Sequence, residues 1–378
     1  MRSKKNNLKS GDFLLVILTI GLVIFGVIMV FSASYYQSIN ETSQSGEGTP
    51  YAYLIKDVMW AILGFGLMMF TAVFDYRRYR KFAVPILAVS FILLVMLLIP
   101  GVGKGAKGAV RWLGVGGFTI MPGEIAKIAL IIFVAWFLSE KPKRIKSFKE
   151  GILPLFVICA VYGGLILKQP NMSTAITVVA IVILMMFVAG LSWWWCGGMV
   201  GLGVLGVASI IIINPESHWA KRFTSFLDPF ADPLGDGFQV VQSLMALGSG
   251  GLFGVGLGKS IQKNLYLPEP QNDFILAIIG EELGFIGILV LLTAYVVLIW
   301  RGIHIAVNAP DQFGTLLASG ITIMIAIQVL LNVAVVTSSM PPTGITLPFV
   351  SYGGNALMLF MGSAGILLNI SRHTVAVK

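Results

Sequence analysis

The stretch "YLPEPQNDFILAIIGEELG", residues 266–284, places a proline-punctuated polar segment directly before a long apolar run. This run covers 274–299, and about 20 consecutive apolar residues are enough for a helix that crosses a bilayer. Asp273 stands at the border, and Glu281 and Glu282 lie inside the run. Ionisable residues at membrane depth are candidates for function by default. The junction therefore indicates a membrane fold and a candidate site together.

The composition of the whole chain agrees with this. Its 378 residues are 57% hydrophobic and 11% charged, whereas a soluble domain is about 25% charged. The apolar residues fall in blocks of about twenty, and a membrane β-barrel would show alternating segments of about ten. We predict an all-α polytopic membrane protein with ten transmembrane helices. The expected spans are 13–33, 55–74, 82–99, 122–138, 151–167, 173–190, 195–213, 274–299, 313–337 and 353–370.

The expected organisation is a single membrane domain over residues 1–378. More than half of the 26 basic residues fall on the side of the N-terminus, and cytoplasmic loops carry the excess of Lys and Arg. We expect both termini, 1–12 and 371–378, in the cytoplasm, and a large outer loop over 214–273 between helices seven and eight. An amphipathic helix over 238–247 should lie at the interface. Topology explains the net charge of +9, so no nucleic-acid partner is predicted.

Asp273 has two interpretations. It follows Pro270 at the start of an apolar run, and Asn272 or Asp273 could cap the helix by accepting from its first amides. Alternatively, its carboxylate stands at the mouth of a membrane cavity and acts as a base or a cation ligand. The residues alone leave both interpretations open.

A second candidate site lies in "RWLGVGGFTIMPGEIAK", residues 111–127. Glu124 and Lys127 are three residues apart, so they share a helix face and can pair. They form either a structural ion pair or part of the chemistry. Arg111 and Trp112 precede them, and Trp is also common as an interfacial anchor.

Two segments rich in glycine or proline complete the candidates. The glycines of 248–258 precede Lys259 but do not fit the phosphate-loop pattern. They form flexible turns at the membrane surface, or their amides and Lys259 hold a lipid diphosphate. "SSMPPTGITLPFVSYGGNA", 338–356, breaks helical structure at three prolines. Irregular backbone at membrane depth is tolerated where it lines a cavity, so we predict a cavity wall.

Four motifs in order resemble the SEDS family (shape, elongation, division and sporulation), which is the FtsW/RodA/SpoVE family. They are "GAVRWLGVGGFTIMPGEIAK", the segment 222–258, "LPEPQNDFILAIIGEELGFIG" and "PPTGITLPFVSYGG". The similarity covers about 11–373 and is greatest to the SpoVE/FtsW branch of division and sporulation. Several positions depart from the family pattern, among them Met121, Gly123 and Asn171. We therefore expect altered hydrogen bonding beside the charged residues.

The resemblance implies a peptidoglycan glycosyltransferase that polymerises lipid II on the outer face of the bacterial cytoplasmic membrane. It implies that Asp273 is the catalytic base that takes the proton of the attacking sugar hydroxyl. A divalent cation, Mg²⁺ or Mn²⁺, is expected with the substrate diphosphate; its ligands are unknown, with Asp273 as a candidate. The expected substrate-binding residues are Arg111, Trp112, Glu124, Lys127, Arg222, Lys259, Lys263, Glu269 and Ser351.

The partner implied is a class B penicillin-binding transpeptidase. Two other functions stay open. A lipid II flippase would also need a lipid-sized groove, but it should carry cations along both halves of its route. A scaffold that recruits the transpeptidase would need no catalytic carboxylate.

Overall fold

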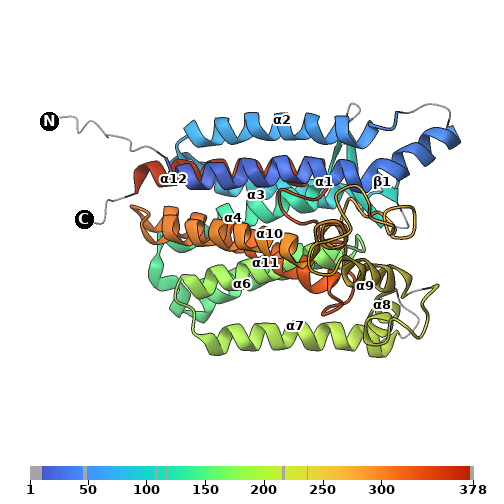
Figure 1. Cartoon of the computed structure of the whole chain (residues 1–378). Helices are drawn as coiled ribbons and strands as arrows, with labels where there is room; N and C mark the ends of the chain where they lie inside the picture. Colours follow the sequence, from blue (N-terminus) through green and yellow to red (C-terminus); the bar gives the residue numbers. More distant parts are fainter. Residues whose placement is uncertain are drawn as a thin grey trace.

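The long helices lie side by side, and the described chain ends meet at one end of the bundle (Figure 1). The computed structural model describes residues 11–45, 49–106, 109–115, 118–214, 218–235 and 237–374. The amide of Asp12, just before the first helix, donates to Ser371 Oγ at 3.0 Å near the end of the last helix. Both described ends therefore lie on the same side, as the prediction for the termini requires.

The elements follow one another in a simple order. We keep the name outer loop for the segment 214–273, after its predicted side. The helices before it are α1 (Phe13–Ser45), α2 (Ala52–Val73), α3 (Tyr79–Met96), α4 (Pro122–Glu140), α5 (Leu153–Leu167), α6 (Met172–Val188) and α7 (Trp193–Ile213). The later helices are α8 (His218–Leu227), α9 (Phe238–Gly250), α10 (Ile275–Val307), α11 (Gln312–Val336) and α12 (Gly354–His373). Short 3-10 or π segments cover Tyr76–Arg78, Pro142–Lys146 and Phe148–Ile152.

The prediction of an all-α polytopic membrane protein is confirmed. Among the described residues, eight helices are long and apolar enough to cross a membrane. They are α1 to α5 and α10 to α12, some extended by the short segments. The other two predicted spans, 173–190 and 195–213, correspond to α6 and α7. α6 is apolar but has only 17 residues, and α7 has 21 residues. The count of ten spans stays a prediction.

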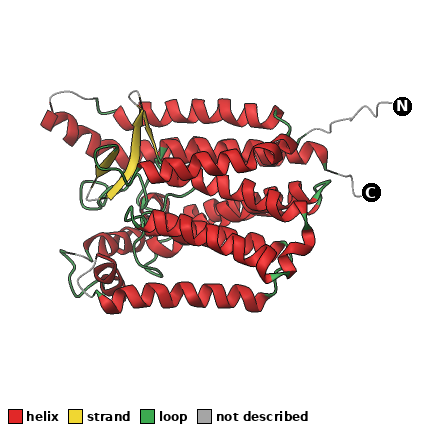
Figure 2. Cartoon of the chain, turned by 180° about the vertical axis from the view of Figure 1, so that it is seen from behind, coloured by secondary structure: helices red, strands yellow, loops and turns green. Residues whose placement is uncertain are grey.

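A small sheet lies between α3 and α4, at the end of the bundle away from the chain ends (Figure 2). Its strands β1 (Gly103–Ala106), β2 (Ala109–Val115) and β3 (Phe118–Ile120) pair antiparallel in the order β1-β2-β3. The last strand ends two residues before α4 begins. The sheet therefore places Arg111 and Trp112 of β2 beside the first turn of α4.

The large outer loop contains two helices at the same end of the bundle, α8 and α9 (Figure 1). α9 confirms the helix predicted over 238–247. It packs on the bundle, because Val240, Val241 and Ala246 are buried and Ser243 Oγ donates to the carbonyl of Val336 at 2.9 Å. The sequence analysis did not predict α8.

α10 is broken at Gly284, whose φ of 70° and ψ of −170° are not helical. A broken helix frees backbone groups that must be paired inside a membrane. Residues 251–256 supply the partners through four hydrogen bonds: Val255 N–H to Glu281 O, Gly256 N–H to Glu282 O, Phe285 N–H to Gly251 O, and Ile286 N–H to Leu252 O.

The glycine-rich segment therefore lies against the backbone of α10. A Cβ on Gly250 would come within 1.9 Å of the carbonyl of Gly280, and a Cβ on Gly254 within 2.1 Å of the carbonyl of Glu282. The expectation of flexible surface turns is wrong for these two positions. Glycine is needed there because two backbones approach closely.

Candidate functional site

A cavity of about 320 Å³ lies at the end of the bundle that carries the sheet. Its walls come from β2, from the N-terminal turns of α4 and α6, from α11, and from the segments before α10 and α12. The sequence-predicted residues that line it are Arg111, Trp112, Glu124, Lys127, Glu269 and Asp273. Residues from two distant parts of the sequence, 111–127 and 269–273, thus share one cavity.

Asp273 is not a helix cap. The N-cap residue of α10 is Phe274, whose side chain makes no capping hydrogen bond, so the expectation that Asn272 or Asp273 is the N-cap residue is wrong. Asn332 of α11 holds the backbone here, because its Nδ2 donates to the carbonyl of Asp273 at 2.8 Å and to that of Ile345 at 2.7 Å. The capping interpretation of Asp273 is removed, and its side chain is placed in the cavity wall.

Gly344 faces the carboxylate of Asp273. Its φ is +72°, and a Cβ there would lie 3.5 Å from Asp273 Oδ2. This glycine belongs to the segment 338–356, for which a cavity wall was predicted. Residues 344–346 and 352–356 line the cavity, so that prediction is confirmed.

Two arginines provide positive charge around Asp273. Burial lowers the pKa of Arg111, the nearby charge of Arg222 lowers it further, and the Asp273 carboxylate opposes both effects. Burial also lowers the pKa of Arg222, again opposed by Asp273. Arg111 donates to the carbonyl of Pro170, and Arg222 donates to that of Pro342 at 3.0 Å. The two guanidinium groups are thus fixed where an anionic ligand beside Asp273 would be stabilised.

Glu124 and Lys127 form the ion pair that the helical spacing predicted. Lys127 Nζ lies 2.7 Å from the Glu124 carboxylate, and the lysine side chain is only 3% exposed. The ammonium also lies 5.8 Å from the centre of the Phe360 ring, within the range of a cation–π contact. Both charged groups line the cavity, so they can act on a ligand as well as on each other.

The sequence analysis missed several lining residues: Trp60, Thr174, Thr177 and Gln328. Gln328 is 2% exposed, and its Oε1 has no hydrogen-bond partner among the described residues. A polar side chain inside the apolar run 313–337 was a readable signal, because buried polar groups normally need a partner. The threonines of α6 gave the same signal more weakly, because a threonine can bond to its own helix.

Four predicted binding residues lie outside the cavity lining. Arg222 interacts electrostatically with Asp273, as described above. Lys259 is exposed. Ser351 is buried, and its Oγ accepts from the amide of Leu347 at 2.7 Å, which stabilises a turn. Lys263 is buried elsewhere, in a polar cluster beside α1.

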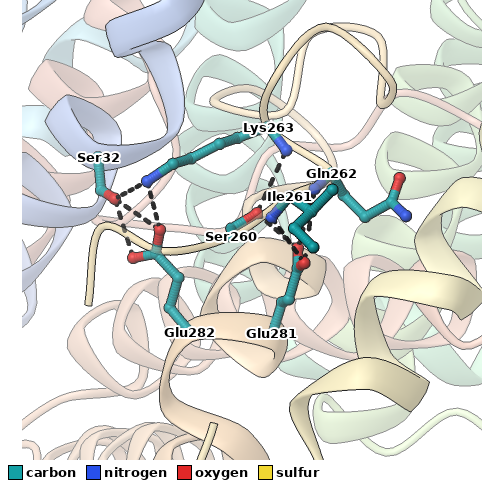
Figure 3. Close-up of polar contacts among 7 residues, drawn as sticks. All are labelled: Ser32, Ser260, Ile261, Gln262, Lys263, Glu281 and Glu282. Carbon is teal, nitrogen blue, oxygen red and sulfur yellow. Dashed lines mark hydrogen bonds and ion pairs between the residues drawn. The ribbon is translucent and has the colours of Figure 1, made fainter. Parts of the chain in front are cut away.

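The cluster around Lys263 is drawn in Figure 3. Lys263 Nζ lies 2.7 Å from Glu282 and 3.0 Å from Ser32 Oγ. Ser32 also donates to the Glu282 carboxylate at 2.8 Å. These side chains come from α1, the outer loop and α10. The interactions tie the outer loop to two helices.

Glu281 makes a second set of contacts in the same view (Figure 3). Its carboxylate accepts from the amide of Ile261 at 2.8 Å and from the hydroxyl of Ser260. Glu281 is 1% exposed and Glu282 is fully buried. Both acids of "GEELG" are therefore anchors for the outer loop, and neither lines the cavity.

The three named departures from the family pattern all lie near the cavity. Met121 lines it. Asn171 caps α6, because its side chain accepts from the amide of Thr174. A Cβ on Gly123 would come within 3.1 Å of Thr174 Cγ2. A serine at position 123 would thus require a small displacement of this threonine.

Comparisons with known proteins agree with the predicted family. The chain is 45% identical over 375 residues to Stage V sporulation protein E of Bacillus subtilis, covering 99% of this chain and 100% of the relative. It is 42% identical over 370 residues to the probable peptidoglycan glycosyltransferase FtsW of Trichlorobacter lovleyi, covering 97% and 95%.

Among solved structures, the fold matches one from a study of the structural coordination of polymerization and crosslinking by a peptidoglycan synthase complex. The TM-score is 0.76 at 28% identity, with 96% of this chain and 98% of that chain covered. The family profile described as "Cell cycle protein" for FtsW, RodA and SpoVE matches residues 12–376. The chain therefore belongs to the FtsW/RodA/SpoVE family.

Proposed function

We propose that this protein is a peptidoglycan glycosyltransferase that polymerises lipid II into glycan strands for cell division or sporulation. The names of its relatives support the activity. The observation that carries the proposal is the position of Asp273 in a cavity that also holds cationic side chains. A glycosyl transfer from a lipid diphosphate needs a base and positive charge at one place.

In the proposed reaction, Asp273 accepts the proton of a sugar hydroxyl as its oxygen bonds to the anomeric carbon of the second sugar. The bond from that carbon to the diphosphate breaks, and the lipid diphosphate leaves with the electron pair. A positioned general base contributes roughly 10²–10⁴-fold to a rate. Arg111 and Lys127 are placed to stabilise the negative charge of the diphosphate.

The described residues could hold a divalent cation only if the substrate supplied some of its ligands. Among the described residues, no group of three or more His, Cys, Asp or Glu could hold a metal ion. Mg²⁺ is commonly bound by one or two carboxylates plus substrate phosphates. Asp273 and the diphosphate would hold the cation, which would neutralise charge on the leaving group.

The cavity faces the outer side of the membrane in this proposal. Both described chain ends lie at the other end of the bundle. The Lys and Arg residues of "RRYRK" lie before α3 and in its first turn, and those of "KPKRIK" lie between α4 and α5. The excess of basic residues predicts that these segments are cytoplasmic. The proposed partner is a class B penicillin-binding transpeptidase, because the solved neighbour belongs to a complex that couples polymerization to crosslinking.

The decisive experiment supplies labelled lipid II to the purified protein and to its Asp273→Asn variant, with and without Mg²⁺ or Mn²⁺. Polymerisation should fall by roughly 10²–10⁴-fold in the variant. Asp228→Asn, at an exposed acid of the same outer loop, is the matched control and should retain full activity. Polymer formation by the Asp273 variant at the rate of the unmodified protein would remove the base from the mechanism.

The same purified protein in vesicles separates a flippase from a polymerase. A flippase moves labelled lipid II between leaflets without forming polymer, whereas the proposed enzyme forms polymer in the leaflet that faces the cavity.

A further inference from the structure

A second cavity of about 220 Å³ lies beside the first, between the end of α1 and the loop that leads into α10. α1 contributes Gln37, Asn40 and Glu41. The loop contributes Lys263, Glu269 and a set of leucines and prolines from 265–270. Glu269 lines both cavities, so the two spaces are neighbours across one residue.

Two tyrosines connect the cavities. Tyr352 lines the first, and its ring packs edge to face on Tyr53 with the centroids 5.1 Å apart. The hydroxyl of Tyr53 donates to Glu41 Oε1 at 2.9 Å, and Gln37 Nε2 donates to the same oxygen at 2.9 Å. The wall of the second cavity is thus hydrogen-bonded to an aromatic pair that reaches the first.

Both cavities carry charges of both signs. Arg111 and Lys127 line the first together with Glu124, Glu269 and Asp273, whereas Lys263 lines the second together with Glu41 and Glu269. The lysine of the second cavity has its ammonium paired with Glu282, 2.7 Å away (Figure 3). Because Arg111 of the first cavity keeps its Nε without a hydrogen-bond partner among the described residues, we expect a diphosphate to favour the first cavity and an uncharged ligand to favour the second.

The second cavity has the chemistry of a sugar-binding site. Carboxylates of Glu41 and Glu269 and the side-chain carbonyl of Gln37 can accept from hydroxyl groups, and the amide group of Asn40 can donate to hydroxyl or acetamido oxygens. The leucines and prolines offer an apolar surface for the C–H face of a ring. Ligand pockets are commonly about 300–1,000 Å³, so this smaller space suits a single ring.

The loop wall is held in an unusual backbone conformation. Leu265 and Glu269 have φ values of 69° and 50°, and non-glycine residues in this region cluster at functional sites. The amide of Leu267 donates to the carbonyl of Gln262 at 2.8 Å, and Asn272 Nδ2 donates to Glu269 Oε2 at 2.9 Å. These bonds fix the side chain that lies between the cavities.

We propose that the second cavity is a saccharide subsite, which binds one uncharged N-acetylated pyranose unit of the glycan next to the sugar that reacts at Asp273. The inference rests on the proposed function, because a polymerase that joins sugars must hold the chain on one side of the new bond. It adds Gln37, Asn40 and Glu41 as binding residues for that chain.

The test uses the full-length protein in detergent and chitotetraose, a soluble uncharged oligomer of N-acetylglucosamine, as the probe. Calorimetry measures its affinity for the unmodified protein and for the Asn40→Ala and Glu41→Gln variants. Each variant should bind about tenfold more weakly, the effect of losing one hydrogen bond to a charged or polar group. With lipid II, each should release shorter glycan strands.

Glu150→Gln, at an exposed acid between α4 and α5, is the control and should change neither measurement. Two variants at separate positions, each checked by its thermal unfolding temperature, guard against a misfolded protein. Failure of the unmodified protein to bind chitotetraose, or equal affinity and strand length in folded variants, overturns the subsite. Absence of polymer with chitotetraose binding intact overturns the proposed function instead.

Discussion

Glu281 and Glu282 are adjacent in sequence, but their carboxylates anchor different groups of the outer loop. Glu281 accepts from the amide of Ile261 at 2.8 Å, whereas Glu282 lies 2.7 Å from the ammonium of Lys263. Both acids lie within three residues of the break in α10 at Gly284. The break, the two anchors and the loop that leads to Asp273 therefore form one connected unit.

The Lys263–Glu282 pair should be purely structural. Lys263→Met leaves a buried carboxylate without its cation, and removing one partner of a buried pair costs about 3–5 kcal/mol. The double variant Lys263→Met/Glu282→Met should recover most of the stability and also most of the polymerisation activity. Thermal unfolding in detergent and lipid II polymerisation measure the two effects.

Lys146→Met, at an exposed lysine between α4 and α5, is the control and should leave both measurements unchanged. A double variant that folds stably but makes no polymer would contradict the structural role and return Lys263 to the list of substrate-binding candidates.

The membrane fold was predicted well because each signal for it lies within a short stretch of sequence. Apolar blocks, proline and glycine positions and the bias of basic residues predict helices, the wall at 338–356 and the common side of the chain ends. The break at Gly284 is different, because it depends on hydrogen bonds to residues 251–256, which lie some thirty positions earlier. The sheet at 103–120 was missed because its glycine-rich strands resemble a loop.

The candidate site was predicted only in part, because some of its features depend on neighbouring residues in the sequence and others depend on residues far apart. Helical spacing alone paired Glu124 with Lys127, and the border position singled out Asp273. Lys263 stays a predicted binding residue, although its ammonium pairs with Glu282. A basic residue in an outer loop has the same sequence signature whether it faces substrate or a buried acid. The choice depends on Ser32 and Glu282, which come from other elements.

The Glu124–Lys127 pair should behave differently from the Lys263–Glu282 pair, because it lines the cavity. Lys127→Met should cost about 3–5 kcal/mol by leaving Glu124 unpaired in a buried position. The double variant Glu124→Gln/Lys127→Met should recover stability but not activity, since the charge that faces the diphosphate is lost. Unfolding and polymerisation assays on the single and double variants separate these effects. Recovery of activity in the double variant would reduce the pair to a structural role.

Asn332 should position Asp273 without taking part in the chemistry. Asn332→Leu removes the donor to two carbonyls, each buried group left unpaired costing about 1–3 kcal/mol. Activity at a temperature well below unfolding should fall as well, because the backbone of Asp273 is released. Asn369→Leu is a matched control, since Asn369 is equally buried and bonds Ala72 and Tyr76 far from the cavity. Asn369→Leu should lose stability but keep its activity. An equal loss of activity in both variants would show that the loss follows from general destabilisation and not from the position of Asp273.

Gly284→Ala should disrupt the unit formed by the break in α10 and the outer loop. The φ of Gly284 is +70°, and a Cβ there would come within 2.3 Å of the backbone nitrogen of Gly254. Because backbone cannot yield as a flexible side chain can, the hydrogen bonds across the break should be lost and polymerisation should fall with them.

Gly66→Ala on α2 is the control. No heavy atom lies within 4 Å of its Cβ position, and alanine in a helix interior should stabilise the protein by roughly 0.5–1 kcal/mol. Hydrogen exchange over 251–263 measures the local effect; protection equal to that of the unmodified protein would show that the break does not depend on glycine.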